Sequence, residues 1–347
     1  MFSHLRAARA LFSATPWKCI LQCAQSVSQL ARPLDRLPRL YSHRLVTSPY
    51  SVELLPKQDH YLRKVLRLGE NDKLLCFHPQ VGEFLAELSP SNSSTSLESC
   101  WLLNILEKVR NLPEFEPQIH LFVAPFDLTK KDFRLVLEKS IELLVSHIHP
   151  YSISPTDIDK SINLEKHNDQ IIEATEQSDR ISVPSLNQVD HSLLDTLARF
   201  DTGPLLLYCP KRLPLLEEYS NLSSYEQSQQ LIHNLPILGD KVQELLHQAL
   251  YHTNNKYHKN ASSSRSEQRH GLNRLLAVGI VIPPRETSCL TDPFWLQVQK
   301  LPHVVPCSLG TFILPTEVAA PLAVSIVADA FHSLEIKLKG KDISVCE

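Results

Sequence analysis

The sequence contains no run of 18 or more apolar residues, which argues against a membrane-spanning segment. Its eight cysteines form no C-x-x-C pair, so the sequence predicts neither a zinc site nor a disulfide framework. We interpret these cysteines as small buried apolar residues. With 43% hydrophobic and 21% charged residues, the composition is that of a soluble globular chain. A length of 347 residues is enough for two domains and a sizeable core.

Acidic residues are almost missing from residues 1–44, where Asp35 is the one acid. Serine, alanine and leucine fill the gaps between seven basic residues. Such a basic, acid-poor segment is typical of a cleaved organelle transit peptide, and a disordered basic tail is the alternative. We expect the mitochondrial matrix, with plastid or cytoplasm as alternatives. The basic residues are Arg6, Arg9, Lys18, Arg32, Arg36, Arg39 and Arg44.

Without residues 1–44, which we call the leader, the remaining chain has a net negative charge. The whole chain carries −3 and the leader +6, which leaves −9 for the remainder. A body of this charge is not a general polyanion binder, so any contact with nucleic acid needs a local basic patch. Arg63, Lys64 and Arg67 form the densest basic cluster outside the leader. They are either a solvated helix face or, as we favour, a contact with RNA phosphates.

Residues 45–114 are expected to form a small β-rich domain. Apolar runs at 72–77, 82–88 and 101–109 predict strands. A helix is predicted over 58–68, with Leu62, Val65 and Leu66 as its inner stripe.

From residue 115 the pattern alternates between strand and helix, which predicts an α/β domain over 115–347 with a linker at 113–117. His147 and His149 share one strand face, but no third ligand is near, so no metal site is predicted.

Residues 211–272 are expected to be a mobile insertion with one helix over 240–251. Strands are predicted at 118–124, 147–150, 203–209 and 275–282, and helices at 130–145 and 163–178, the first capped by Thr129 with a stripe of Phe133, Val136, Leu137, Ile141 and Leu144.

The stretch 305–331 leads from Gly310 through a short apolar step into an almost wholly apolar helix. Pro321 fits such a helix only in its first turn. Leu322, Ile326 and Ala330 are then expected on one buried face, against a sheet or a partner subunit. Ligands of open α/β sheets bind beyond the carboxyl ends of strands, so the turns at Pro283 and Gly310 are candidate binding sites.

Four segments together resemble one family. They are His60-x-Leu62-x-x-Val65-Leu66-Arg67; Glu138-Lys139 with Glu142-Leu143, where Leu144 replaces the family's glycine; Glu173-Ala174-x-Glu176-Gln177-Ser178-x-Arg180 with Pro184; and Ser308-Leu309-Gly310 with Ile313-Leu314, Glu317 and Ala319. In these segments the chain resembles the RsmE-type small-subunit (16S) rRNA uracil-N3 methyltransferases of the SPOUT superfamily. The resemblance covers nearly everything after residue 42 except the insertion.

The resemblance implies a PUA-like RNA-binding first domain and a second domain tied in a trefoil knot. It further implies a homodimer that uses S-adenosyl-L-methionine to methylate N3 of a uridine in small-subunit rRNA, with the rRNA or the ribosomal subunit as partner and neither metal nor membrane. Glu317 and Arg180 are the implied catalytic residues, although Arg180 could instead pair with a glutamate and Glu317 with the helix dipole. The implied cofactor-binding residues are Val281, Ile282, Pro283, Pro284, Leu309, Gly310, Ile313, Leu314 and Thr316.

The chain departs from the family pattern at the turns. The family's Gly-Pro-Glu-Gly-Gly falls on residues 283–287, where only the second proline is kept. Two motif arginines fall on Phe312 and Pro315, and a threonine on Val318. The alternative to an active enzyme is therefore a catalytically inactive relative that binds rRNA or assists ribosome assembly.

Overall fold

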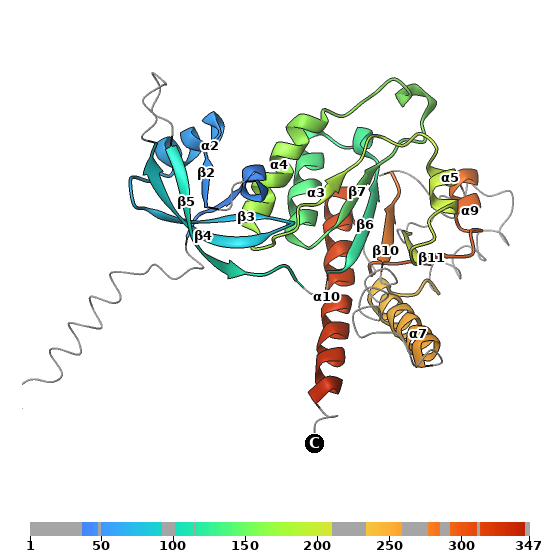
Figure 1. Cartoon of the computed structure of the whole chain (residues 1–347). Helices are drawn as coiled ribbons and strands as arrows, with labels where there is room; N and C mark the ends of the chain where they lie inside the picture. Colours follow the sequence, from blue (N-terminus) through green and yellow to red (C-terminus); the bar gives the residue numbers. More distant parts are fainter. Residues whose placement is uncertain are drawn as a thin grey trace, which may run out of the picture. The chain divides into compact units, whose positions relative to one another are not determined.

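The computed structural model describes residues 37–47, 50–91, 101–113, 116–209, 234–258, 277–284, 292–310 and 313–343. The chain divides into two compact units, unit 1 from Met1–Leu112 and unit 2 from Pro113–Glu347 (Figure 1). Residues 1–36, the tips of the two candidate turns (285–291 and 311–312) and much of the expected insertion lie outside the described residues.

Unit 1 is built on a five-stranded sheet with the strand order β1-β3-β4-β5-β2. β1 pairs with β3 in parallel, and the other neighbours are antiparallel. The three strands predicted from the apolar runs are present as β3, β4 and β5. The elements are β1 Arg39–Tyr41, η2 His43–Val46, β2 Ser51–Glu53, α2 Pro56–His60, η3 Tyr61–Val65, β3 Lys73–His78, β4 Gly82–Pro90 and β5 Trp101–Arg110.

The start of unit 1 corrects the boundary at residue 44. Strand β1 places Arg39, Leu40 and Tyr41 in the sheet, and Leu40 and Leu45 belong to the core of this unit. Arg39 also forms a buried 2.7 Å ion pair with Glu83. A cleaved leader would therefore have to end before Arg39, because cleavage at residue 44 would remove a strand and part of the core.

The predicted helix over 58–68 is shorter and changes its form. Helix α2 continues into a single π turn, η3, in which the Leu66 N–H bonds to the Tyr61 carbonyl at 3.0 Å. A π turn holds one residue more than an α turn, so it rotates the side chains that follow. Leu62 is buried, but Val65 is 58% exposed and does not belong to the inner stripe.

Unit 2 is an α/β unit around a six-stranded parallel sheet with the order β11-β9-β10-β6-β7-β8. The central strand β10 is buried along its whole length, as expected for an unbroken apolar run covered on both faces. The elements are β6 Gln118–Val123, η4 Pro125–Asp127, α3 Lys130–Glu142, β7 His147–Pro150, η5 Pro155–Asp157, α4 Leu164–Gln177, β8 Ser185–Leu186, α5 Leu193–Ala198, β9 Leu205–Tyr208, α7 Leu238–His258, β10 Ala277–Ile282, α9 Pro293–Val298, β11 Val304–Cys307 and α10 Thr316–Ile343.

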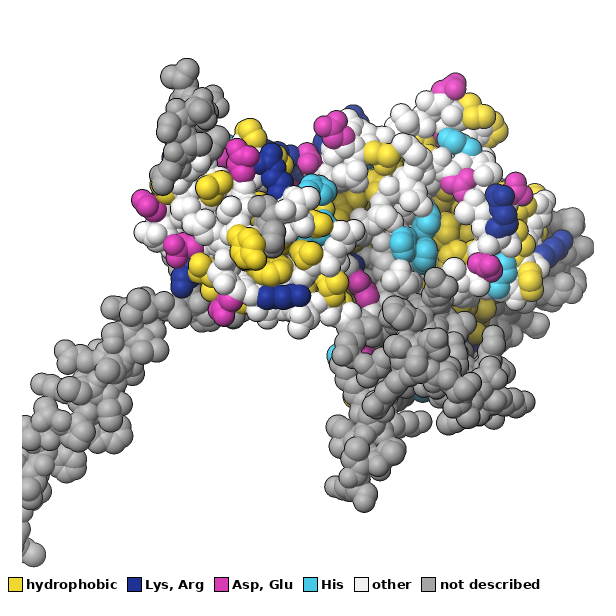
Figure 2. Space-filling view, in the orientation of Figure 1, with side chains coloured by type: hydrophobic (Ala, Val, Ile, Leu, Met, Phe, Trp, Pro, Cys, Tyr) yellow, Lys and Arg dark blue, Asp and Glu magenta, His cyan; other side chains and the backbone are white. Residues whose placement is uncertain are grey.

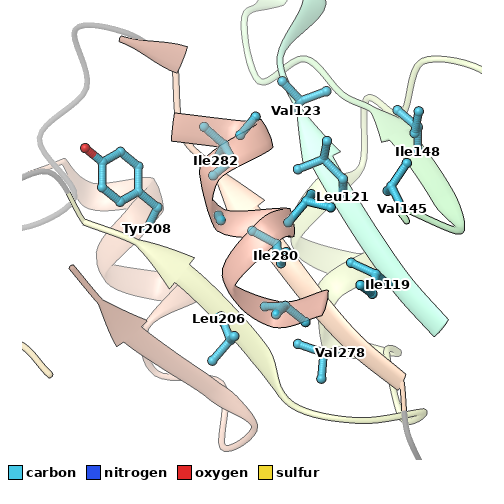
Figure 3. Packing of buried hydrophobic residues seen from close by; sticks show 14 of the residues in the cluster. Ile119, Leu121, Val123, Val145, Ile148, Leu206, Tyr208, Val278, Ile280 and Ile282 are labelled. Atoms are coloured by element: carbon cyan, nitrogen blue, oxygen red, sulfur yellow. The ribbon is translucent and has the colours of Figure 1, made fainter. Parts of the chain in front are cut away.

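Both faces of this sheet are packed. Side chains from β6, β9 and β10 lie together in the larger core (Figure 3). Residues of α3, α4, α7 and α10 complete this core. Residues from α5 and α9 cover part of the opposite face, over β9, β10 and β11. Alternate residues of β6 point to opposite sides, so that Ile119 and Leu121 enter the first core and Phe122 the second.

Helix α3 begins as predicted, since the Thr129 hydroxyl accepts a bond from the Asp132 N–H. It ends at Glu142, before Leu144, which has a φ of +75° and is 42% exposed. Leu144 is therefore not in the buried stripe. Its left-handed backbone explains why glycine suits this position.

Helix α7 contains the helix predicted over 240–251, but it does not lie in a mobile insertion. Leu238, Val242 and Leu246 are buried in the larger core. The Leu238 N–H also bonds to the Ser308 carbonyl at 2.9 Å. The first half of this helix is thus part of the core of unit 2 rather than of a surface loop.

Helix α10 also differs from its prediction. It begins at Thr316, so Pro321 lies inside it and not in its first turn. Its buried side is formed by small residues such as Ala320 and Ala323, whereas Leu322 is 37% exposed. Of the face expected to be buried, Ala330 is buried and Ile326 packs against the core, so the expectation was wrong for Leu322. A helix that is apolar all round has no pattern that fixes which side is buried.

By length and composition, Thr316–Ile336 of α10 is apolar enough to cross a membrane. Half of the tested window is buried inside the unit, however, and the core helix of a globular domain passes the same test. Packing in the core explains its apolar character without a membrane.

Candidate functional site

The carboxyl edge of the parallel sheet brings the two candidate turns together. β10 and β11 both pair with β9, so the turns leave the sheet on either side of Tyr208, the last residue of β9. With a spacing of about 4.8 Å between strands, the two turns begin roughly 10 Å apart. This is the edge at which open α/β sheets bind ligands.

The turn after β11 is shaped by Ser308 and Gly310. The Ser308 hydroxyl accepts from the Gly310 N–H at 3.1 Å and donates to the Gly310 carbonyl at 2.8 Å. Gly310 has a φ of +121°, and a Cβ at this position would meet no atom of the described residues within 4 Å. The backbone conformation therefore favours glycine, and no described residue blocks an approaching group beside it.

The end of β10 is buried. Val281, Ile282 and Pro283 are all inaccessible, and Pro284 is half-buried. The Tyr151 hydroxyl donates a 2.7 Å hydrogen bond to the Ile282 carbonyl. Since prolines have no N–H, residues 283 and 284 offer a ligand only carbonyl groups and apolar surface.

The segment ahead of α10 forms the other side of the edge. Ile313 is 54% exposed, Leu314 is half-buried and Thr316 is buried. The Leu314 N–H donates to the Tyr208 hydroxyl at 3.3 Å. Glu317 lies in the first turn of α10, where the helix dipole favours a carboxylate.

These residues give the edge a consistent chemistry. It offers apolar side chains, backbone carbonyl groups, a glycine in open space and a carboxylate at a helix start. Such a mixture of apolar surface with a few polar groups is typical of small-molecule sites. The cofactor-binding residues predicted from the sequence all lie in these two turns or at their flanks, together with Glu317.

Arg180 is not part of this edge. Its guanidinium donates to the carbonyls of Ile141 and Val145, at 3.1 and 2.7 Å, and lies 3.3 Å from a carboxylate oxygen of Glu116. These groups surround the amino ends of β6 and β7, at the opposite end of the strands. Burial lowers the pKa of Arg180, and the charge of Glu116 opposes this. The geometry gives Arg180 a structural role, in place of the catalytic role expected from the sequence.

The basic cluster of unit 1 has two exposed members. Lys64 and Arg67 are exposed, and Arg67 has a φ of +58°. Arg63 is half-buried, with its guanidinium carbon 4.5 Å from the centroid of the Trp101 ring and a nitrogen 3.6 Å from Asp59. Arg63 is therefore partly held by the protein, whereas the other two present their charges to solvent.

Tyr151 and Tyr208 are functional candidates that the sequence did not reveal. Tyr208 ends an apolar strand and Tyr151 directly follows a short one, so a role in the core was sufficient to explain both. Only the tertiary structure shows that both hydroxyls reach the backbone of the two turns.

A ladder of histidines lies on the sheet face on which α5 and α9 pack, where Phe122 belongs to the smaller core. The rings of His147, His120, His149 and Phe122 stack in this order, with centroids 4.3, 5.2 and 4.4 Å apart. Figure 2 shows histidine side chains gathered on this unit. Burial, with smaller contributions from the neighbouring histidines, lowers the pKa of His120 to about 3. Burial and His147 lower the pKa of His149 to about 4, against the charge of Asp190.

The described residues contain no group of three or more His, Cys, Asp or Glu side chains that could hold a metal ion.

Two cavities lie away from the carboxyl edge. One of about 60 Å³ between α3 and α4 is lined by Arg134, Glu138, Gln170, Glu173, Ala174 and Gln177. The other, of about 430 Å³, lies at the amino ends of β9 and β11, beside Gly203 and His303. Motif residues Glu138, Glu173 and Gln177 thus meet on the helical surface and not at the candidate site.

The chain is similar to known RNA methyltransferases. A family model described as an RNA methyltransferase domain matches residues 113–233. A curated relative, ribosomal RNA small subunit methyltransferase E of Rickettsia conorii, is 30% identical over 152 residues. That match covers 43% of this chain and 58% of the relative, which is less than two thirds of its length.

Solved structures share the fold. The methyltransferase Lpg2936 of Legionella pneumophila, solved with its cofactor SAM, has a TM-score of 0.54 at 19% identity and covers 85% of this chain and 98% of that one. Ribosomal RNA small subunit methyltransferase E of Neisseria gonorrhoeae, bound to S-adenosyl methionine, has a TM-score of 0.53 at 18% identity, with coverages of 84% and 96%. At these identities the likeness is one of fold.

Proposed function

We propose, from the premise that this chain belongs to the RsmE-type RNA methyltransferases, that it methylates N3 of a uridine in small-subunit rRNA with S-adenosylmethionine as methyl donor. The observation that carries the proposal is the carboxyl edge of the parallel sheet, where two turns flank Tyr208 and no described residue fills the position of a Cβ on Gly310. The site is at the place where this sheet class binds its ligands.

The residues at this edge fit the cofactor. Adenine is flat and mainly apolar, and suits the surface formed by Val281, Ile282, Ile313 and Leu314. The backbone of Leu309 and Gly310 can approach a ligand closely, because a Cβ beside Gly310 would lie in open space. Pro283, Pro284 and Thr316 complete the set we assign to cofactor binding.

Methyl transfer to N3 requires an unstacked uracil, removal of the N3 proton and an in-line arrangement of nitrogen, methyl and sulfur. The sulfonium of the bound cofactor supplies an activated methyl group. The chain must therefore mainly position the base and accept a proton. We assign the second task to Glu317, whose carboxylate lies at the start of α10 beside the turn.

Unit 1 is proposed to bind the RNA backbone through Arg63, Lys64 and Arg67, as a PUA-like domain. Its π turn supports this role, because it exposes Tyr61 and Val65 beside the cations. A surface with both positive charge and apolar side chains suits an RNA segment whose bases are unpaired. Since the rest of the chain is acidic, this local patch is where a phosphate contact is most favourable.

Two finer features of the fold are also proposals. We expect unit 2 to be knotted, with α10 passing against both β6 and β10. We expect a homodimer through the outer face of α10, where Val318, Leu322 and Ile336 are 44%, 37% and 58% exposed. A mass of two chains in light scattering would support the dimer, and the mass of one chain would contradict it.

A mitochondrial location is proposed from the basic leader. Because β1 begins at Arg39, the cleavage site is expected within residues 1–38. Import of the full chain into isolated mitochondria, with loss of the leader, tests this. Import into plastids alone, or retention of an uncleaved leader in the cytoplasm, would contradict it.

A second candidate function rests on the prolines of the β10 turn. Pro283 is buried and has no N–H to offer a ligand. This favours a relative that no longer transfers methyl groups and acts as an rRNA-binding or ribosome-assembly factor.

Calorimetry separates the two functions. Protein that begins at residue 37 should bind S-adenosylmethionine with micromolar affinity if it is an enzyme, and should give no heat at millimolar cofactor if it is not. Mapping N3-methyluridine in small-subunit rRNA with and without the gene then identifies the nucleotide. Methylation that is unchanged without the gene would exclude the enzyme function.

A further inference from the structure

Two buried tyrosine hydroxyls hold the backbone at the two sides of the candidate cofactor site. The Tyr151 hydroxyl donates to the Ile282 carbonyl at 2.7 Å, and the Tyr208 hydroxyl accepts from the Leu314 N–H at 3.3 Å. Both rings are buried, with exposed fractions of 0% and 4%. Residues 131 and 106 positions apart in the chain are thereby joined, so these bonds are features of the tertiary structure.

The two rings approach the edge from opposite faces of the sheet. Tyr151 packs in the smaller core beside Trp295, with a centroid distance of 6.2 Å. Tyr208 lies in the larger core, and in Figure 3 its hydroxyl points away from the labelled aliphatic side chains. Each hydroxyl is therefore fixed by a ring packed in a core of its own, which is the arrangement needed to hold a loop in one position.

At the start of the turn after β11, Ser308 bonds to Gly310 and, through its backbone, to Pro236 and Leu238, and the two tyrosines add an anchor on each side of the edge. Pro283 and Pro284 have no N–H, so neither can donate a backbone hydrogen bond. On the other side, Gly310 has no side chain to pack and adopts a φ of +121°. A turn made of such residues depends on bonds from neighbouring elements for a defined position.

We infer that Tyr151 and Tyr208 are positioning residues, which hold the backbone of Ile282 and Leu314 at the separation that the cofactor requires. This rests on the proposed function, since it assigns the ligand. It also limits the role of Leu314: its N–H is already bound to Tyr208, so it meets the ligand through its side chain or its carbonyl. Neither tyrosine is assigned a contact with the reacting atoms.

The test replaces each hydroxyl and keeps the ring. Tyr208→Phe and Tyr151→Phe should each weaken S-adenosylmethionine binding in calorimetry by about five- to tenfold, the effect of losing one hydrogen bond. A matched control is Tyr41→Phe in unit 1, which removes a buried tyrosine hydroxyl bonded to His43 at 3.0 Å. Its cofactor affinity should equal that of the parent protein.

Hydrogen exchange without cofactor gives a second readout that does not need an active enzyme. In Tyr208→Phe the amide of Leu314 should exchange faster, while amides in the middle of β10 keep their protection. A loss of protection throughout unit 2 would indicate a merely structural role and would overturn the inference. Should Tyr208→Phe be too unstable to purify, Tyr151→Phe is tested by the exchange of the flanking amides of Val281 and Ile282.

The outcomes separate this inference from the proposed function. If the parent protein binds cofactor and both variants bind it equally well, the inference is wrong and the function stands. If the parent gives no heat, the function is wrong, and the exchange at Leu314 still decides whether Tyr208 holds this segment. Weaker binding by both variants with unchanged melting temperatures supports both.

Discussion

The Nδ1 atom of His120 lies 3.0 Å from the Nε2 atom of His149, so the two rings share one proton. The Nδ2 group of Asn187 lies 2.8 Å from Nδ1 of His149. Because an amide NH₂ can only donate, His149 carries its proton on Nε2 and donates it to His120. When both rings are neutral, His149 donates this hydrogen bond to His120. When both rings are protonated, neither has a nitrogen that can accept, and the bond is lost.

The first prediction is that acid destabilises unit 2. The pKa values of His120 and His149, about 3 and about 4, lie below the value of about 6.5 expected in the unfolded chain. At pH values between these folded-state pKa values and about 6.5, the unfolded chain binds more protons than the folded chain. The free energy of unfolding therefore falls as the pH falls below about 6.5. We expect a loss of about 1–3 kcal/mol in the free energy of unfolding between pH 7 and pH 5.

Urea unfolding at a series of pH values checks this. The variant His120→Phe keeps a stacked ring in the ladder and removes one titrating group, so its unfolding should depend less steeply on pH. The groups that face the pair are His147, Asn187 and Asp190, and none of these is changed. An equally steep pH dependence in His120→Phe would contradict the prediction.

The second prediction concerns the start of unit 1. A chain that begins at residue 37 should keep the stability of the full chain, whereas one that begins at residue 45 loses β1, with Leu40 and Tyr41. Burial of these side chains and the ion pair between Arg39 and Glu83 should together contribute about 4 kcal/mol or more to unit 1. Thermal unfolding of the two truncated chains measures the difference. Equal melting temperatures would show that β1 is dispensable.

A third prediction uses the backbone of Leu144. Its φ of +75° is strained for a residue with a Cβ, and its side chain is 42% exposed, so little packing is lost on its removal. Leu144→Gly should raise the free energy of unfolding of unit 2 by about 0.5–1 kcal/mol. Leu135→Gly is the control, since Leu135 is similarly exposed, at 39%, but lies inside α3, where glycine destabilises. A destabilised Leu144→Gly would mean that the leucine packs more than its exposure indicates.

Those parts of the fold that follow from local pattern could be predicted from the sequence. β10 is an unbroken apolar run of a strand's length, and such a run in an alternating α/β pattern leaves few alternatives. Thr129 with Asp132 indicated the start of α3 through the chemistry of a helix cap. In contrast, the orientation of α10 depends on which neighbours pack against it. No periodicity in an almost wholly apolar segment carries that information.

The candidate site was predictable in part for the same reason. Gly310 could be found because a glycine between a strand and an apolar helix indicates a turn. For Arg180 the structure shows structural partners where a catalytic role was expected, because a charged residue in a motif does not reveal whether it contacts a ligand or backbone carbonyls of the protein. Val65 was misplaced because a π turn leaves no signal in an α-helical pattern.

The fourth prediction is that Arg180 acts on stability alone. Arg180→Ala leaves the carbonyls of Ile141 and Val145 without these donors and Glu116 without this charge. Its side chain is 5% exposed, so the free energy of unfolding of unit 2 should fall by about 3–5 kcal/mol. Cofactor affinity measured on the folded protein should not change. A loss of cofactor affinity without a loss of stability would show that Arg180 has a functional role.

The last prediction is that Glu317 is needed for methyl transfer but not for binding of the cofactor. Glu317→Gln keeps the size of the side chain at the start of α10 and removes the carboxylate that we assign as proton acceptor. The rate of methyl transfer to rRNA should fall by about a hundredfold or more, because general bases contribute at least this much. Cofactor affinity should stay within about twofold of the parent, since the loops that bind it are unchanged. Asp329→Asn, at an exposed acid of the same helix, is the control and should leave both quantities unaltered. If Glu317→Gln methylates rRNA at the parental rate while Asp329→Asn behaves as expected, the proton must be accepted elsewhere.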